Sequence, residues 1–379
     1  MILRVLDVGD GACSIIQCEN HIHNVTVIDC GSDNRGPELA SQRLLEAVGH
    51  RPETIDTIVI THFDTDHYMG LLRLAQWMKE RSRSFHRLRL VAPRPPQIEP
   101  DFVVQYLAFM TYHTGIRNLD VGLALMDVTE PGEFYYQPVD RGTTFHTSHW
   151  QFEVHWPPQN LPNRVAGEVR TAMRLFEGFS QKLRAREITT LDTNLKVTRE
   201  GIGVWPHNGS RDTDTSVTEG SADDEIIEID GDDEEEASED LRIDNLELPD
   251  DLQDDYKKVW DAFRRANNDM SLIFDDSDHE AFIDFGDAGT SVLRWLGRYG
   301  NIGSHYTAML APHHGTHPLP RQLTVRAASC ISQNGEKRGD LWWKHVTSHK
   351  HNYLPCLSTQ SGSHHLHLDH QYGYWCQSC

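Results

Sequence analysis

No stretch of the 379-residue sequence approaches the roughly 18 consecutive apolar residues that a membrane-spanning helix needs. The first residues pass from Met1 directly into ILRVLDVG, without the charged segment, long apolar segment and cleavage site of a secretory signal. Cysteine is scarce as well, because only seven are present, an odd number scattered without the pattern of a disulfide framework. These absences predict a cytoplasmic protein that does not engage the membrane.

The formal net charge of −22 comes mainly from one segment. Residues 223–255 contain 18 of the 57 acidic residues and one of the 35 basic residues, so the rest of the chain is only mildly acidic. Residues 209–255 are rich in Ser, Thr, Asp and Glu and poor in aromatics, which predicts a disordered acidic insertion. Two roles stay open for it: a solvated surface insertion, or a regulatory segment that binds a basic protein partner or competes with a polyanionic substrate.

The remaining sequence alternates strand-like and helix-like segments, the order of a layered α/β domain. Before residue 97 the pattern predicts three strands within the first thirty residues, a helix over 37–49, a strand over 55–61, a helix through 71–80 and a strand over 88–92. Residues 97–208 are predicted to be a partly helical insertion with the half-buried strand QFEVHWPP inside it. The α/β pattern resumes at DMSLIFDD, so we predict a single domain spanning residues 1–379.

The segment THFDTDH, residues 61–67, places two histidines and two aspartates directly after the apolar run TIVI. Side chains two positions apart share a face in extended or loop backbone. His62 and Asp64 are therefore expected to face one point, while Asp66 and His67 reach a second point beside it. Imidazole nitrogens and carboxylate oxygens so placed suit two metal ions a few ångströms apart.

Four side chains cannot fill the coordination of two metal ions, so further ligands are expected at other strand ends. Each candidate follows an apolar run and precedes Gly or Pro: His155 in FEVHWPP, Asp287 in FIDFGDAG, and His313 and His314 in LAPHHGTH. His146 and His149 are alternatives to His155. The tail HHLHLDH, with Cys356, Cys376 and Cys379, leaves a small structural zinc site open as a separate hypothesis.

These segments together resemble the metallo-β-lactamase fold superfamily, and most closely its ComEC-type branch, in which aspartate replaces the second histidine of the HxHxDH loop. The resemblance covers roughly residues 1–92 and 265–335, with FEVHWPP between, and rests on LDVGDGACSIIQ, VIDCGS, THFDTDHYMGLL, ANNDMSLIF, FGDAG and APHHGTH. It implies an αββα sandwich. Asp10 departs from the glutamine common in the branch, and Thr316-His317-Pro318 replaces its serine-rich continuation.

The resemblance also implies a binuclear metal centre. One ion would be held by His62, Asp64 and His155 and the other by Asp66, His67 and His314, with Asp287 bridging both. His313 would face the substrate, so Asp66 and His313 are the predicted catalytic residues, and Asp29 is interpreted as a turn or supporting residue. Carboxylate oxygens favour Mn²⁺ and imidazole favours Zn²⁺, so the predicted cofactors are two divalent ions, either Zn²⁺ or Mn²⁺.

For function, the resemblance implies metal-dependent hydrolysis of phosphodiesters, most directly by a nuclease that acts on DNA or RNA. The sequence has no basic stripe of the kind that holds nucleic-acid phosphates; the candidate cations lie in 81–90 and between Arg164 and Arg186. One alternative is a small-molecule phosphodiesterase that acts on a cyclic nucleotide or a phosphocholine-type ester. The other is a non-catalytic binding or regulatory protein stabilised by its metal.

Overall fold

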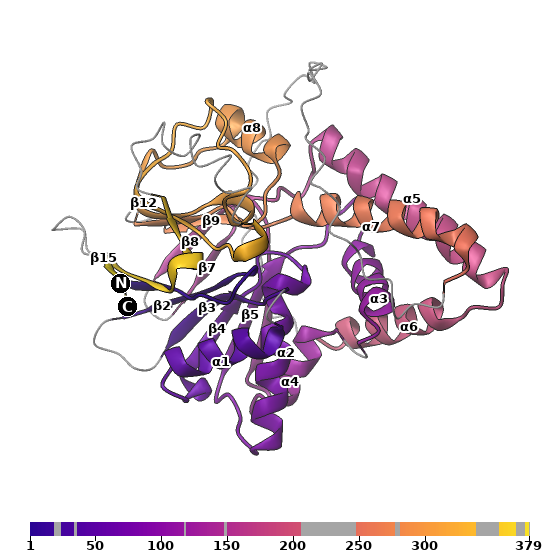
Figure 1. The fold of residues 1–379 in the computed structure, drawn as a ribbon, viewed down its shortest axis with the longest axis horizontal. Coiled ribbons are helices and arrows are strands. Elements are labelled where there is room, and N and C mark those ends of the chain that lie inside the picture. The colour runs from indigo at the N-terminus through magenta and orange to yellow at the C-terminus, as the bar shows by residue number, and fades with distance from the viewer. Residues whose placement is uncertain are drawn as a thin grey trace.

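The computed structural model describes residues 1–18, 24–33, 36–116, 119–147, 150–205, 248–276, 281–338, 356–368 and 376–378. Two β-sheets pack face to face in the main body, and helices cover their outer faces (Figure 1). This arrangement confirms the predicted αββα architecture.

The first sheet contains, within the described residues, eight strands in the order β15-β14-β1-β2-β3-β4-β5-β6. They are β1 (Ile2–Val5), β2 (Cys13–Gln17), β3 (Val25–Cys30), β4 (Ile55–Val59), β5 (Leu88–Pro93), β6 (Phe134–Val139), β14 (His364–His367) and β15 (Cys376–Ser378). The strands β3, β4, β5 and β6 run parallel to one another. Their carboxyl ends therefore meet at one edge of the sheet.

The second sheet contains seven strands in the described part of the chain, in the order β13-β12-β11-β10-β9-β8-β7. They are β7 (Thr144–His146), β8 (Gln151–Trp156), β9 (Ile273–Asp276), β10 (Phe282–Asp284), β11 (His305–Leu310), β12 (Arg326–Ser332) and β13 (Cys356–Ser358). The strands β9 and β10 form an antiparallel pair. Because β10, β11 and β12 are parallel, their carboxyl ends also share one edge.

Neighbouring residues in the central strands pack into different apolar layers. Ile58 joins the layer beneath α1 (Pro37–Ala47), α2 (Thr65–Glu80) and α4 (Val121–Asp127), while Val59 packs between the sheets. Likewise Phe282 packs between the sheets, and Ile283 faces α8 (Thr290–Tyr299). Successive side chains on a strand point to opposite faces. Strands covered on both faces therefore read as the near-continuous apolar runs seen in the sequence.

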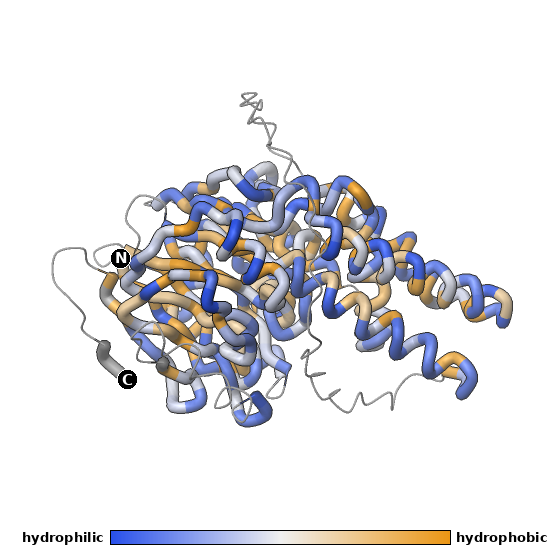
Figure 2. Tube along the Cα trace, turned by 90° about the horizontal axis from the view of Figure 1, so that it is seen from above, coloured by the Kyte–Doolittle hydropathy of each residue, from blue (hydrophilic) through white to orange (hydrophobic). Residues whose placement is uncertain are grey.

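Four helices project to one side of the sandwich as a helical arm (Figure 1): α3 (Phe102–Thr114), α5 (Asn163–Arg184), α6 (Thr190–Gly203) and α7 (Gln253–Asn268). Its core is aromatic, since Phe109 packs against Phe176, Phe179, Tyr256 and Phe263. Hydrophobic and hydrophilic residues alternate along the arm helices, as expected for helices with one buried face (Figure 2). Among the described residues, no helix is long and apolar enough to span a membrane.

The predicted acidic segment, 209–255, lies outside the described residues as far as 247. Its C-terminal boundary was placed too late, because a short 3-10 helix, η2 (Asp250–Leu252), leads directly into α7. The helix forms here because three apolar side chains are buried against the arm: Leu248, Leu252 and Tyr256. The acidic composition of the segment gives no indication of this burial. Further 3-10 turns are η1 (Pro52–Thr54), η3 (Pro312–Gly315) and η4 (Thr359–Ser361).

Candidate metal centre

The predicted ligands meet where carboxyl ends of strands from both sheets come together. His62 follows β4 in the first sheet, while Asp287 follows β10 and His314 follows β11 in the second. Two backbone hydrogen bonds fix this junction: Leu272 N–H donates to the Thr61 carbonyl at 2.8 Å, and His313 N–H donates to the Gly286 carbonyl at 2.8 Å. Parallel strands thus gather side chains that lie far apart in sequence.

Four buried side chains form a compact cluster at this edge: Asp66, His67, Asp287 and His314. Each offers a ligand atom, and these atoms all lie within 4.8 Å of one another. Nε2 of His314 is 3.1 Å from Asp66 Oδ2 and 3.4 Å from Asp287 Oδ2. Nε2 of His67 is 3.4 Å from Asp287 Oδ1 and 3.1 Å from His314 Nε2. Asp66 and His67 lie in the first turn of α2, not in the loop before it, because that helix begins at Thr65.

Hydrogen bonds behind the two histidines turn their Nε2 atoms toward the cluster. His67 Nδ1–H donates to Asp29 Oδ2 at 2.8 Å, and His314 Nδ1–H donates to the Gln333 carbonyl at 2.7 Å. Asp29 is held in turn by Thr61, whose N–H and O–H donate at 2.8 and 2.7 Å. A proton on Nδ1 leaves the Nε2 lone pair free for a cation. These contacts agree with the interpretation of Asp29 as a supporting residue.

The cluster keeps its carboxylates ionised. Burial alone would raise the pKa of Asp66, but Arg338, His67 and His314 outweigh it and hold that pKa well below its ordinary value. The pKa of Asp287 is likewise well below its ordinary value, because the nearby histidines outweigh burial. Burial would lower the pKa of His314, but the facing carboxylates raise it to about 9. The buried carboxylates thus stay ionised and are compensated by the facing histidines and Arg338.

His62 and Asp64 form a second group beside the cluster. His62 Nε2 is 3.4 Å from Asp64 Oδ2 and 3.8 Å from Asp287 Oδ2. The His62 side chain is fully buried; its Nδ1 lies 3.2 Å from Thr61 Oγ1, whereas its Nε2 makes no hydrogen bond to any described residue. A buried polar atom normally has a hydrogen-bond partner. The Nε2 atom of His62 faces two carboxylates and has no such partner, as expected if it binds a metal ion. Asp287 lies between the two groups, as expected of a residue that would serve both.

The structure does not bring His155 to these residues. It lies near the end of β8, where its Nε2 contacts Asp275 Oδ1 at 2.9 Å, and both side chains are buried. Of the alternatives, His146 is an exposed residue of β7, and His149 lies outside the described residues. His155 thus pairs with a carboxylate of the neighbouring strand, and its role as the third ligand of the first ion stays a prediction.

Replacing His155 with alanine is expected to lower stability without removing metal. The change leaves Asp275 buried without its ion-pair partner, which costs about 3–5 kcal/mol for a buried pair, partly offset because Tyr306 O–H still donates to Asp275 at 2.6 Å. Thermal unfolding and the metal content of the purified protein measure the two effects. Loss of metal from a folded variant would restore His155 as a ligand.

His313 and His314 leave η3 in different directions from a strained backbone. Both have positive φ angles, 49° and 55°, which side chains other than glycine seldom adopt. This geometry sends His314 into the cluster, whereas His313 Nε2 lies 3.5 Å from Asp287 Oδ2 with its Nδ1 3.0 Å from His317 Nε2. His314 also lies 3.4 Å from Asp287 Oδ2, so the division of the pair into a metal ligand and a substrate-facing residue stays a prediction.

Arg338 is a site residue that sequence reasoning missed. Its side chain is only 10% exposed, and Nη1 lies 2.9 Å from Asp66 Oδ2. Asp10 shapes the turn that carries it, accepting hydrogen bonds from the backbone N–H groups of Gly335, Lys337 and Arg338 at 2.8, 3.2 and 3.1 Å. No local pattern marks Arg338, although the departure at Asp10 pointed to this neighbourhood.

Several of the cations proposed for phosphate binding form ion pairs elsewhere. In the arm, Lys182 pairs with Asp255, Arg186 pairs with Asp251 and Arg184 lies 2.7 Å from Asp192. In the segment 81–90, Arg83 pairs with Glu53 at 2.5 Å. That segment precedes β5, so it lies at the sheet edge opposite the predicted ligands. Within the described residues, these cations therefore do not line a groove at the cluster.

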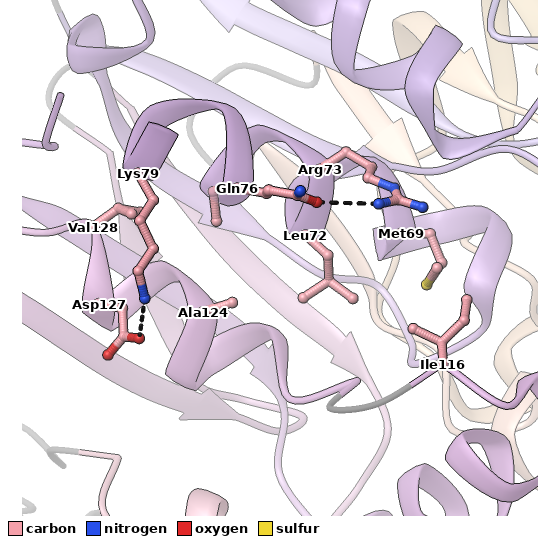
Figure 3. Close-up of a pocket in the computed structure, with 10 residues that line it drawn as sticks. Met69, Leu72, Arg73, Gln76, Lys79, Ile116, Ala124, Asp127 and Val128 are labelled. Carbon is pink, nitrogen blue, oxygen red and sulfur yellow. Dashed lines mark hydrogen bonds and ion pairs between the residues drawn. The ribbon is translucent and has the colours of Figure 1, made fainter. Parts of the chain in front are cut away.

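A surface hollow of about 300 Å³ lies between α2 and α4 (Figure 3). Met69, Leu72, Ile116 and Ala124 supply its apolar lining, and Lys79 pairs with Asp127 at its rim at 3.4 Å. The hollow is formed by later turns of α2, whereas the cluster residues lie in the first turn. It is therefore separate from the candidate metal centre.

Comparison with known proteins gives a family match over part of the chain. Residues 6–148 match the model of the metallo-beta-lactamase superfamily. No curated protein matches the sequence significantly. Among solved structures, the metallo-beta-lactamase fold protein YhfI from Bacillus subtilis is 8% identical, with a TM-score of 0.40 over 96% of this chain and 100% of that one.

Two further structures align over a smaller part. Zn²⁺-bound PqqB from Methylobacterium extorquens is 13% identical, with a TM-score of 0.26 over 41% of this chain and 55% of that one. The short form of human tRNase Z is 16% identical, with a TM-score of 0.22 over 41% of this chain and 59% of that one. This chain thus spans between half and two thirds of their lengths. The similarity to the metallo-beta-lactamase superfamily thus covers residues 6–148, which include His62, Asp64, Asp66 and His67.

Proposed function

We propose that the chain is a metal-dependent hydrolase of phosphodiester bonds. The observation that carries this proposal is the convergence of Asp66, His67, Asp287 and His314, buried and with ligand atoms within 4.8 Å of one another. Two carboxylates and two imidazoles that face one point are a donor set typical of a divalent metal site. Such a group is costly to bury for structural purposes alone.

The donor set fits two divalent ions. Asp66, His67 and His314 would hold one, His62 and Asp64 the other, and Asp287 would serve both. Mixed nitrogen and oxygen donors suit Zn²⁺ and Mn²⁺, and the three aspartates move the balance toward the harder ion. When bound, such ions supply an activated water and stabilise charge on phosphoryl oxygens.

The protein's own residues complete this chemistry. His313 Nε2, 3.5 Å from Asp287 and backed by His317, is placed to give a proton to the leaving oxygen of the ester. Arg338 neutralises Asp66 and holds it in place through the 2.9 Å contact. The buried walls around the ligands exclude bulk water, which strengthens each of these electrostatic interactions.

Replacing His313 with alanine is expected to leave metal content unchanged and to lower the hydrolysis rate by about 10²–10⁴-fold, the usual contribution of a general acid. Elemental analysis and initial rates of the same preparation test this. His86→Ala is the matched control, because His86 is exposed and pairs with Glu130 at 2.7 Å near the start of β5. A His313 variant that loses metal would show that the division of the histidine pair is wrong.

Phosphodiesters are proposed over lactams because aspartate, not cysteine, stands at position 287 and because the motifs resemble the ComEC-type branch. That branch implies DNA or RNA as the first substrate class. The ion pairs made by Lys182, Arg184 and Arg186 favour a second candidate, a small phosphodiester that needs no basic groove. A protein partner for the acidic segment stays a prediction, because residues 209–247 lie outside the described part of the chain.

The test is elemental analysis combined with assays in Mn²⁺ and Zn²⁺ on single- and double-stranded DNA, RNA and bis(p-nitrophenyl) phosphate. Two ions per chain with cleavage of a nucleic acid would support the nuclease. Two ions with cleavage of the small ester alone would support the small-diester enzyme. Absence of both metal and turnover would overturn the proposal and favour a binding protein.

A further inference from the structure

The helical arm reaches the candidate metal centre through Asp64. Tyr106, in α3, donates its O–H to Asp64 Oδ1. Asn268, the last residue of α7, donates to Asp64 Oδ2 at 3.1 Å when its amide nitrogen faces that oxygen. Both carboxylate oxygens of Asp64 therefore accept hydrogen bonds from arm helices: α3, which lies in the insertion 97–208, and α7, which leads into β9.

The conformation of Asp64 shows the effect of these contacts. Asp64 occupies the N-cap position of α2, where an aspartate normally accepts a backbone N–H of the first turn. Its side chain makes no such capping bond. Instead Oδ2 lies 3.4 Å from His62 Nε2. The side chain is thus turned from its ordinary capping role toward the neighbouring predicted ligand.

The packing of the arm holds the ring of Tyr106 in place. Tyr106 is fully buried, with its ring 5.6 Å from Phe263 of α7 and 6.2 Å from Phe102 of α3. The hydroxyl therefore points at Asp64 only while α3 and α7 are packed together. Asn268 depends on the same packing, because it ends α7 four residues before β9 begins at Ile273.

We propose that the helical arm builds the second metal position: Tyr106 and Asn268 hold the Asp64 carboxylate toward His62, so that this position binds its ion tightly only when the arm is docked. Tyr106 is a positioning residue, since it acts through Asp64. The inference rests on the proposed two-ion hydrolase, and it implies that the two metal positions differ in their dependence on the arm. The Asp66, His67 and His314 position is built from the sandwich and does not need the arm, whereas the His62 and Asp64 position does.

The test is titration of the full-length protein with Mn²⁺, followed by calorimetry and by the electron paramagnetic resonance signal of paired Mn²⁺ ions. Tyr106→Phe removes one hydroxyl and keeps the ring. It is expected to lower the affinity for one of the two Mn²⁺ ions by about 10–100-fold, the usual effect of losing a hydrogen-bond partner of a metal ligand. The other ion should keep its affinity, and the signal of the paired ions should disappear at Mn²⁺ concentrations that saturate only the tighter position.

Tyr112→Phe is the matched control, because Tyr112 lies on the same helix and packs against Phe179 within the arm. It should bind both ions as the wild type does. Asn268→Ala provides a second variant with the same expected loss, should Tyr106→Phe fail to fold. Circular dichroism establishes which variants are folded.

The outcomes separate this inference from the proposed function. If wild-type protein binds no Mn²⁺ or Zn²⁺, the proposed function itself is wrong. If it binds two ions, and folded Tyr106→Phe and Asn268→Ala bind both with wild-type affinity, only the role of the arm is wrong. An equal loss of affinity for both ions would also overturn the inference, because the arm would then support the whole site and not one position.

Discussion

Replacing Asp287 with alanine is expected to remove metal from both positions and to lower hydrolysis by roughly a thousandfold or more. Asp287 contacts histidines of both groups, with oxygens 3.4 Å from His67 and His314 and 3.8 Å from His62. Bound metal ions contribute several kcal/mol of charge stabilisation in hydrolases, and about 1.4 kcal/mol corresponds to a factor of ten in rate. The measurements are metal content and initial rates.

The control for this variant is Asp284→Asn. Asp284 ends β10, three residues before Asp287, and accepts a hydrogen bond from Gly286 N–H at 2.8 Å, which an asparagine oxygen can still accept. Burial already raises the pKa of Asp284 to about 7, so loss of its charge is a small change. This variant should keep its metal. If Asp287→Ala retains two ions, Asp287 does not bridge them.

Replacing Gly31 with alanine is expected to lower the free energy of unfolding by about 3 kcal/mol or more, at the upper end for overpacking in a core. A Cβ at this position would lie 2.2 Å from the backbone carbon of Asp66, 2.4 Å from its carbonyl oxygen and 2.5 Å from the backbone nitrogen of His67. These are backbone atoms, which cannot rotate away. The start of α2 would have to move, and two predicted ligands would move with it.

Denaturant unfolding and metal titration of Gly31→Ala measure the two consequences. Gly167→Ala is the matched control, because Gly167 lies within α5 and a Cβ there meets no atom within 4 Å. Alanine in a helix is favoured over glycine by up to about 1 kcal/mol, so the control should be as stable as wild type or more so. A Gly31 variant with unchanged stability and metal affinity would show that the start of α2 can move to accommodate the Cβ without a loss of stability.

The predicted ligands converge in most cases where a motif and an apolar strand occur together. His62, Asp287 and His314 each follow such a strand, and the structure brings them to one edge. His155 also follows one, yet it pairs with Asp275. The signal was the same in all four cases. Strand ends meet at one edge only if the strands run parallel in the same part of the sheet. Even there, a side chain near the end of a strand can form an ion pair with a residue of the neighbouring strand.

Some predictions stay untested by the structure. The tail hypothesis of a structural zinc site depends largely on residues outside the described part of the chain, and the single-domain prediction also stays a prediction. The metal assignments are proposals until ions are measured. What the geometry adds is a set of supporting contacts, such as the bond from His67 to Asp29, that makes each assignment specific enough to test.

The sequence by itself determined the layered α/β fold, the strands that end in potential ligands and the carboxylate-rich character of the site, because strand periodicity and short motifs are local properties. Only the tertiary structure decided which residues surround those ligands. Arg338 reaches Asp66 across more than 270 positions, and Tyr106 reaches Asp64 across an inserted helix. Such contacts depend on how separate helices and sheets pack. The apolar residues that determine this packing do not indicate in the sequence which polar side chain will point into the site.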